Sequence, residues 1–587
     1  NTSEAAIAAG SRHGNTAAGQ PSSNSNVGNF SIDHVNFDNV ATAFSHGSGD
    51  GTVVTMSDYS ISNAQDSCLD FAKDSVVTLT SGTMNNCNLG DDPAHGAIVN
   101  DGISTKGSLT VEFLNVTNAY RNLIDVDFSA VSLKHIDAVL PGVSQTGYAV
   151  NSVGRGVSGS TAWCGLYASC TLVENLTVTG GAYDEGVVVS SATDYHLEKI
   201  SLEAGDVTYD YGGIGTVPTE YNALIDDITT TGDLIIEGGS VPATVSTINV
   251  NNVLLTGDAT SSNSMQATDW TITDSIKVLA SCGWNIELND FASTGIYLSC
   301  SSPNNKNRVR ASNGAVSHDS DDVTNTHAMY ARNSDLTLGE TTITSLDIGD
   351  NLAAGGIALV AYSSLNSDIR LVAVELIIDT DQDDILDAAS DCTGPSDCAV
   401  EFVSSADIWF GGLATVVVTK EEPANSGTFV PKPDHYVSAN YVDNATPSTD
   451  GFAIGLTKTD ATGVASNVWV ISADEDGNAV NLNAIHVWGA GGVNDTMPSD
   501  AWYPGCNTAE SCANATNLAA NASFTVGDSF TAILEPKPVS FTGTPMTCAD
   551  IGSHPDAGLM GSGSNPAMHE TDEVYTFEAK VTMETDV

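Results

Sequence analysis

The stretch Gly107–Asn118, GSLTVEFLNVTN, decides the fold that the sequence predicts. It contains two alternating apolar pairs, Leu109 with Val111 and Leu114 with Val116. Alternation within a pair indicates a β-strand, because successive strand side chains point to opposite faces. The two-residue break between the pairs indicates a bend in that strand.

The same pattern returns along the chain as far as Thr419. With Val111 as the marker, typical copies lie about 22–25 residues apart, a period that predicts a solenoid. The coils of a solenoid bury their apolar faces only by stacking on one another. By pattern, the equivalents of Val111 are Ile32, Met56, Leu79, Leu133, Val173, Leu197, Ile225, Val250, Ile272, Leu288, Ala311, Leu338, Leu371 and Phe410.

Many copies carry a further apolar pair ahead of the first, as in AVEFVSSADIWF (Ala399–Phe410). Each coil therefore reads strand, polar turn, strand, bend, strand, and Ser, Asn and Asp suit the turn. Over Asn29–Thr419 this coil resembles the right-handed parallel β-helix of the pectin-lyase-like superfamily. Val, Ile and Thr at period two argue against amphipathic helices. An array of ordinary β-sandwiches is the alternative.

The rest of the chain predicts three further segments. Residues 1–28 are small and polar and predict a cap, because a solenoid end exposes apolar surface and strand edges. Residues 421–434 contain three prolines and predict a linker after a β-helix of residues 29–420. Residues 435–587 read as longer strands and predict an immunoglobulin-like β-sandwich. The predicted fold class is therefore all-β: a parallel β-helix solenoid followed by a β-sandwich domain.

The charge balance restricts the partners. Lys and Arg number 18 against 73 Asp and Glu, which gives a net charge of −55. This excludes nucleic acid, whose phosphates need basic patches, and argues against an anionic membrane surface. The acidity suits high salt, an acid habitat or divalent cations. No apolar run reaches the length of a membrane span, and we expect any signal peptide to have been removed.

The 11 cysteines predict disulfides rather than zinc, because no CxxC occurs and no histidine is interleaved at zinc-ligand spacing. The expected pairs are Cys68 with Cys87, Cys164 with Cys170, Cys282 with Cys300, Cys392 with Cys398, and Cys506 with Cys512, which leaves Cys548 over. Disulfides imply an oxidising compartment. Sequons for N-glycosylation lie at Asn1, Asn29, Asn115, Asn175, Asn444, Asn494, Asn514 and Asn521. Together these features predict an extracellular glycoprotein of the cell surface.

Two short motifs have the letters of a catalytic site. Hydrolases of the pectin-lyase-like superfamily carry GDD-like and His-Gly motifs on neighbouring coils, and Gly90-Asp91-Asp92 and His95-Gly96 match them in letters. Here both motifs lie in one turn, and no NTD or Arg-x-Lys motif accompanies them. The lyases imply a basic residue, for which the candidates are Lys134, His135, Arg308 and Arg310. GxSxG and HExxH are absent, so no catalytic residue is assigned.

The acidic stretch DTDQDDILD, residues 379–387, resembles the start of a calcium loop, because it offers carboxylates at alternate positions. Its candidate ligands are Asp379, Asp381, Asp383, Asp384 and Asp387. The central glycine of such a loop is missing, and Ser390 stands where the closing Glu belongs. A solvated acidic turn is the alternative, and Ca²⁺ is the single cofactor candidate.

The preferred function is an exported structural protein that assembles with copies of itself into an extracellular filament, sheath or surface layer, with adhesion as an added role. One alternative is a polysaccharide lyase or glycoside hydrolase on the same fold. Another is a carbohydrate-binding adhesin that uses inserts near Cys164 and Tyr209. The fold by itself does not choose among these functions.

Overall fold

The computed structural model describes residues 7–9, 29–46, 52–72, 75–92, 94–101, 107–128, 130–142, 145–153, 170–190, 194–210, 223–239, 244–259, 264–279, 282–301, 306–318, 328–345, 368–378, 390–392, 407–421, 427–431, 433–434, 436–441, 457–474, 483–488 and 529–534. The chain forms two compact units. Unit 1 is Asn1–Arg308 with Ala328–Ser334, and unit 2 is Val309–His327 with Asp335–Val587. The described residues form strands and no helix, so none of them belongs to a helix that could cross a membrane.

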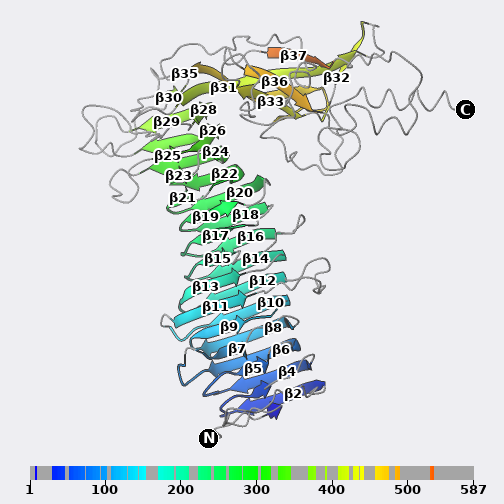
Figure 1. Cartoon of the computed structure of the whole chain (residues 1–587), viewed down its shortest axis with the longest axis vertical. Coiled ribbons are helices and arrows are strands. Elements are labelled where there is room, and N and C mark those ends of the chain that lie inside the picture. Colours follow the sequence, from blue (N-terminus) through cyan, green and yellow to red (C-terminus); the bar gives the residue numbers. More distant parts are fainter. Residues whose placement is uncertain are drawn as a thin grey trace, which may run out of the picture. The chain divides into compact units, whose positions relative to one another are not determined.

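Unit 1 is built from two sheets of parallel strands (Figure 1). The even sheet contains β2 (Phe30–Asp38), β4 (Val53–Ser62), β6 (Val76–Cys87), β8 (Ser108–Ala119), β10 (Ala130–Val139), β12 (Cys170–Thr179), β14 (Asp194–Leu202), β16 (Ala223–Thr229), β18 (Thr244–Val250), β20 (Ser264–Ile272) and β22 (Asn285–Ser293). The odd sheet contains β1 (Ile7–Ala9), β3 (Phe44–His46), β5 (Leu69–Ala72), β7 (Gly96–Asp101), β9 (Asn122–Val126), β11 (Gln145–Val153), β13 (Tyr183–Ser190), β15 (Val207–Asp210), β17 (Leu234–Gly239), β19 (Val253–Ala259), β21 (Ser275–Val278), β23 (Gly295–Ser299) and β25 (Met329–Arg332).

The chain visits the two sheets alternately, so one repeat consists of an even-numbered strand and the odd-numbered strand that follows it. Each strand pairs in parallel with the corresponding strand of the next repeat. This confirms the predicted all-β class and its stacked parallel strands. The arrangement is compatible with a β-helix-like solenoid.

The register of strand pairing shows which of the predicted equivalents of Val111 are correct. Val111 lies opposite Leu79 on one side and Leu133 on the other, as the pattern predicts. The two equivalents chosen for β18 and β20 are wrong. Ile225 pairs with Val245, which pairs with Ala267, whereas Val250 and Ile272 face one another five residues further along. Buried apolar residues lie on both sides of the bend in β18 and β20, and the prediction took those after the bend for those before it.

The expected bend is a left-handed residue at one fixed place in every even strand of unit 1. These residues form a line across the sheet that we call the bend column, and their φ angles run from 47° to 60°. The bend column consists of His34, Asp58, Ser81, Phe113, His135, Asn175, Lys199, Asp227, Thr247, Asp269 and Asp290. Because one residue leaves the pleat here, apolar side chains on both sides of it point to the same face.

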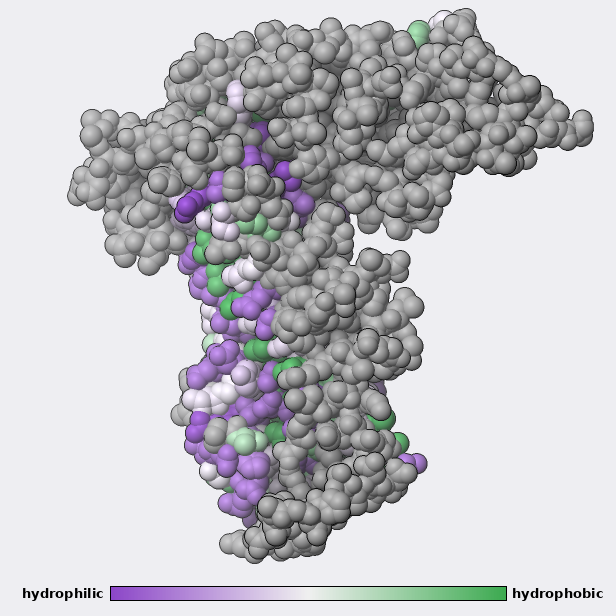
Figure 2. Space-filling model, viewed as in Figure 1, coloured by the Kyte–Doolittle hydropathy of each residue, from purple (hydrophilic) through white to green (hydrophobic). Residues whose placement is uncertain are grey.

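The core of unit 1 lies on the inner faces of the strands. Leu109, Val111, Leu114 and Val116, the positions that define the pattern, are at most 2 % exposed. Tyr209 is fully buried and stacks on Tyr195 with ring centroids 3.8 Å apart. Tyr209 is therefore a core residue, and the rest of the insert near it, residues 211–222, lies outside the described residues, so its proposed role in sugar binding stays a prediction. On the face in Figure 2, hydrophilic residues predominate in unit 1, and smaller hydrophobic areas lie between them.

Two disulfides join parts of unit 1 that are close in sequence. Cys68 bonds Cys87, and Cys282 bonds Cys300, which are the pairings expected from the sequence. Cys170 is also disulfide-bonded, whereas its expected partner Cys164 lies outside the described residues. The remaining predicted pairs and Cys548 include undescribed residues and stay predictions.

Unit 2 begins with parallel strands and then changes pattern. Its parallel part contains β24 (Asn307–His318, from Val309 on), β26 (Ser334–Gly339, from Asp335 on), β27 (Thr342–Ser345), β28 (Asp368–Val372), β29 (Val374–Ile378) and β31 (Asp407–Glu421). Leu338, Leu371 and Phe410 lie in register on β26, β28 and β31, as predicted. The short β30 (Ser390–Cys392) pairs antiparallel with β29.

The later strands of unit 2 pair mainly antiparallel. They are β32 (Phe429–Pro431), β33 (Tyr436–Tyr441), β34 (Thr457–Lys458), β35 (Val464–Asp474), β36 (Asn483–Trp488) and β37 (Ser529–Leu534). The long strand β31 pairs antiparallel with β32 and β35 and parallel with β37. β33 pairs antiparallel with β34 and β36. Part of the range predicted as a linker, residues 421–434, is thus the strand β32.

Candidate functional site

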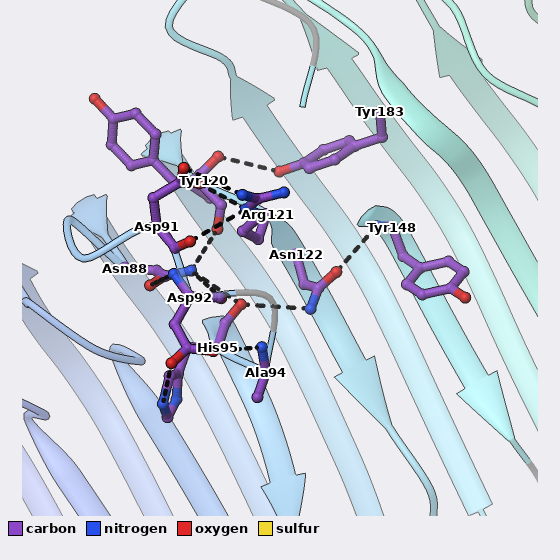
Figure 3. Close-up of polar contacts among 11 residues, drawn as sticks. Asn88, Asp91, Asp92, Ala94, His95, Tyr120, Arg121, Asn122, Tyr148 and Tyr183 are labelled. Carbon is purple, nitrogen blue, oxygen red and sulfur yellow. Dashed lines mark hydrogen bonds and ion pairs between the residues drawn. The ribbon is translucent and has the colours of Figure 1, made fainter. Parts of the chain in front are cut away.

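The two motifs that match hydrolases in letters lie together in the link between β6 and β7 (Figure 3). Asn88 organises this link. Its side-chain nitrogen lies 2.8 Å from the carbonyl oxygen of Asp92 and 3.2 Å from those of His95 and Tyr120, and its Oδ1 accepts the Asp92 N–H. Because Asn88 is fully buried and satisfied by main-chain groups, it fixes the path of the loop rather than facing a substrate.

Asp91 forms an ion pair with Arg121 of the next repeat. Arg121 Nε lies 2.6 Å from Asp91 Oδ1, and Nη2 donates to Oδ2 at 3.2 Å. Two parallel contacts of this kind fix a carboxylate in orientation as well as position. The first carboxylate of the GDD motif is therefore used to join one repeat to the next.

His95 lies between a serine and an aspartate. Its Nδ1 is 3.0 Å from Ser67 Oγ, and its Nε2 is 4.0 Å from Asp92 Oδ2. These residue types are those of a hydrolytic triad, in which the serine must reach the substrate. Ser67 is fully buried and also accepts the Gly96 N–H at 3.4 Å, so its hydroxyl is not placed to attack a bound substrate.

The same network extends into the following repeats through Asn122. The Asn122 amide donates toward the carbonyl of His95 at 3.4 Å and toward Asp125 at 3.3 Å, and its Oδ1 accepts the Tyr148 N–H at 3.1 Å. A side chain on Gly96 would collide with Asn122, so the glycine of the His-Gly motif allows close packing of repeats. The residues of the GDD-like and His-Gly motifs therefore hold neighbouring repeats together in this chain.

Two carboxyl groups on the odd sheet have raised pKa values. Burial raises the pKa of Asp125, which a hydrogen bond from Asn151 at 2.9 Å opposes. Burial also raises the pKa of Glu237, and the charge of Asp210 and a hydrogen bond to it act in the same direction. Asp210 and Glu237 are register partners on β15 and β17. General-acid catalysis uses a carboxyl with a raised pKa next to a second carboxyl, so this pair is the strongest catalytic candidate among the described residues.

One described group of side chains could hold a metal ion. Single ligand atoms of Asp33, His34 and Asp58 lie within 4.8 Å of one another, and all three residues are exposed. The His34 nitrogens lie 2.7 Å from Asp33 and 3.3 Å from Asp58. The hydrogen bond to Asp33 raises the pKa of His34, and the charges of both aspartates add to it. A metal ion at this cluster would therefore compete with the proton for the imidazole lone pair of His34.

The remaining predicted sites divide between described and undescribed residues. The calcium ligands Asp379, Asp381, Asp383, Asp384 and Asp387 lie outside the described residues. Among the basic candidates, Lys134 forms an ion pair with Glu174 at 2.9 Å, and Arg310 is almost fully buried. The described sequon asparagines Asn29, Asn115 and Asn175 are all exposed, and the other five lie outside the described residues.

Sequence reasoning missed a ladder of asparagines at the ends of the first even strands. Asn118 donates to the Asn86 side chain at 3.0 Å, Asn86 donates to Asn63 at 2.8 Å, and Asn63 donates to Asp38 at 2.8 Å. We call these four residues the Asn ladder. Its signal was present in the sequence, because each asparagine lies at the same interval after its marker residue (Met56, Leu79 or Val111).

No protein-family model, no curated protein and no solved structure matches this chain.

Proposed function

We propose that this chain is an exported structural protein whose repeats form a right-handed parallel β-helix, and that it assembles with copies of itself into an extracellular filament, sheath or surface layer. The observation that carries the proposal is that residues of the GDD-like and His-Gly motifs make contacts between repeats. Asp91, Ser67 and His95 hold neighbouring parts of the stack together, as the Asn ladder does. Reactive side chains engaged in this way suit a structural rod rather than an enzyme.

The disulfides and the charge support the same function. Two disulfides with fully or nearly fully buried cysteines fit folding in an oxidising, extracellular compartment. The net charge of −55 leaves the surface strongly acidic, which keeps separate molecules apart until salt or divalent cations screen it. The antiparallel strands of unit 2 support the further proposal that residues 435–587 contain a β-sandwich.

Electron microscopy of the native protein, with and without calcium and at low and high salt, tests this function. Regular filaments or sheets would support assembly, and dependence on calcium would direct mutagenesis to Asp379–Asp387. Single, separate particles under every condition would overturn it.

The second candidate is a glycoside hydrolase or lyase acting on an acidic polysaccharide. It is favoured by the Asp210–Glu237 pair, since Glu237 has the raised pKa that a general acid requires. The test is a screen of polysaccharides for cleavage by the native chain and by D210N and E237Q. Cleavage that both variants abolish would favour the enzyme over the structural protein.

A further inference from the structure

We propose that Asn115 carries an N-linked glycan and that the first sugar of this glycan packs on the exposed ring face of Phe113. The inference rests on export, as the proposed function has it, and it adds a defined modification site to that function. Both residues lie on β8 in unit 1.

Phe113 is unusual for its position. It belongs to the bend column, where every other described member in unit 1 is polar or charged, and its φ is 60°. A bulky side chain in the left-handed region is a true outlier. Phe113 is also 52 % exposed, so its ring gains little from burial. An exposed aromatic ring in a column that is otherwise polar is available to contact a group outside the fold.

One face of the Phe113 ring is already covered. The ring stacks on His135 of the next repeat, with centroids 4.8 Å apart and planes 5° from parallel. His135 is itself held by Asn175, whose amide nitrogen lies 2.8 Å from Nδ1. In the preceding repeat the bend column has Ser81, whose side chain is small and exposed, and from this and the exposure of Phe113 we infer that the opposite ring face is open. The platform is therefore rigid on one side and available on the other.

Asn115 is placed to deliver a sugar to this platform. Leu114 points into the core, so Phe113 and Asn115 emerge as neighbours on the outer face of β8. Asn115 is exposed, its side chain makes no hydrogen bond within the described part of the chain, and the exposed Thr117 completes the sequon. The carbon-bound hydrogens of a pyranose ring form an apolar face that matches the face of an aromatic ring.

The modification is a balanced transfer. A bond forms between Asn115 Nδ2 and C1 of the sugar, and the bond between C1 and the phosphate oxygen of a polyprenyl-phosphate-linked donor breaks. The lipid phosphate leaves with the electron pair, and the amide proton passes to a base. Phe113 takes no part in this step and acts afterwards, by holding the attached sugar.

Asn175 provides an internal comparison. Its amide nitrogen, the atom that would carry a sugar, is engaged with His135, and Val173 two residues before it is buried. A glycan there would have no aromatic ring at the corresponding place. We therefore expect energetic coupling to Phe113 only for a glycan on Asn115.

The first test is glycopeptide mass spectrometry of the native protein, covering Asn29, Asn115 and Asn175. A glycan on Asn115 is the expected result. A bare Asn115 beside a glycosylated Asn29 or Asn175 would overturn this inference and leave the proposed function standing. Bare sequons in a protein retained inside the cell would overturn both.

The second test measures the packing of the sugar. The Tm is measured for F113A, N115Q and the double variant. Each is prepared once as glycosylated protein and once from a host without N-glycosylation. We expect F113A to lower Tm by about 2 °C more in the glycosylated protein, and the excess to vanish in the N115Q background. The N29Q background is the matched control, because Asn29 is an exposed sequon asparagine outside the Phe113–His135 stack, and the excess should persist there. Equal losses in all backgrounds would overturn the proposal, because backbone effects of the substitution are common to all of them.

Discussion

The ring of Tyr59 occupies the space that Gly82 leaves empty in the next repeat. The two residues are register partners on β4 and β6, both are buried, and a Cβ built on Gly82 would overlap the tyrosine ring. A large residue on one strand is thus matched by the absence of a side chain on its neighbour. Consecutive repeats fit as complementary pairs, which ties the identity of one residue to that of another in the next repeat.

Substitution of Gly82 by alanine should destabilise unit 1. The new methyl group meets the buried ring of Tyr59 rather than the end of a flexible side chain, and overpacking of this kind costs about 1–3 kcal/mol. Thermal or denaturant unfolding of G82A measures the loss. A double-mutant cycle with Y59L is the control, because a smaller side chain relieves the collision. Strictly additive losses would show that the two residues do not share this space.

Replacement of Tyr59 by phenylalanine should be neutral or stabilise the protein by up to about 1 kcal/mol, because the buried Tyr59 hydroxyl has no hydrogen-bond partner among the described residues. Burial raises the pKa of Tyr59, and that of Tyr183 for the same reason, so both rings stay neutral. Tyr183 is the matched control, because its hydroxyl donates to the Ala119 carbonyl at 3.4 Å. We expect Y183F to lose stability where Y59F does not. A clear loss in Y59F alone would contradict this.

Both the side-chain hydrogen bonds of Asn86 and its left-handed backbone conformation should affect the stability of unit 1. Its side chain bonds to Asn63 and Asn118, and its φ is 55°. N86G removes the hydrogen bonds and should cost about 1–2 kcal/mol. N86A should cost about 1 kcal/mol more, because alanine resists the left-handed conformation. Denaturant unfolding of the two variants compares these losses. Equal stabilities of N86G and N86A would show that the conformation adds nothing.

The ion-pair cluster at His34 should give a pH dependence of known sign. The pKa of His34 is raised above 6.5, first by the hydrogen bond to Asp33 and then by the charges of Asp33 and Asp58. Protonated His34 therefore stabilises the fold fully below pH 6.5, and this contribution is lost as the pH rises through the folded-state pKa. NMR titration of His34 measures the shift, which D33N should reduce more than D58N. High salt should weaken it further. A native pKa at or below 6.5 would be the contrary result.

Much of the fold of unit 1 was predictable, because burial follows the apolar pairs around Val111 directly. The register of β18 and β20 was not, since the pairs before and after the bend look alike and only strand pairing separates Val245 from Val250. The left-handed conformation of the bend column could not be predicted from residue type either, because His, Ser, Lys, Thr and Phe all occur in it. A backbone conformation imposed by stacking overrides the preference of the single residue there.

The candidate site was less predictable than the fold. The letters of Gly90-Asp91-Asp92 and His95-Gly96 indicated where polar side chains gather, but not that Arg121 and Ser67 would engage them. Those partners come from other repeats, and their approach depends on the register of the strands. Asp210 and Glu237 become neighbours for the same reason, although neither belongs to a recognisable motif.

The bend column sets a rule for how unit 1 can change in length. An insertion of an odd number of residues within an even strand would move its bend out of line with the bends on both sides and turn the apolar side chains beyond the insertion toward water. A duplication or deletion of one whole repeat would leave every remaining bend in line. Unit 1 can therefore change in length only by whole repeats, and tandem duplication is the genetic event through which its length can evolve.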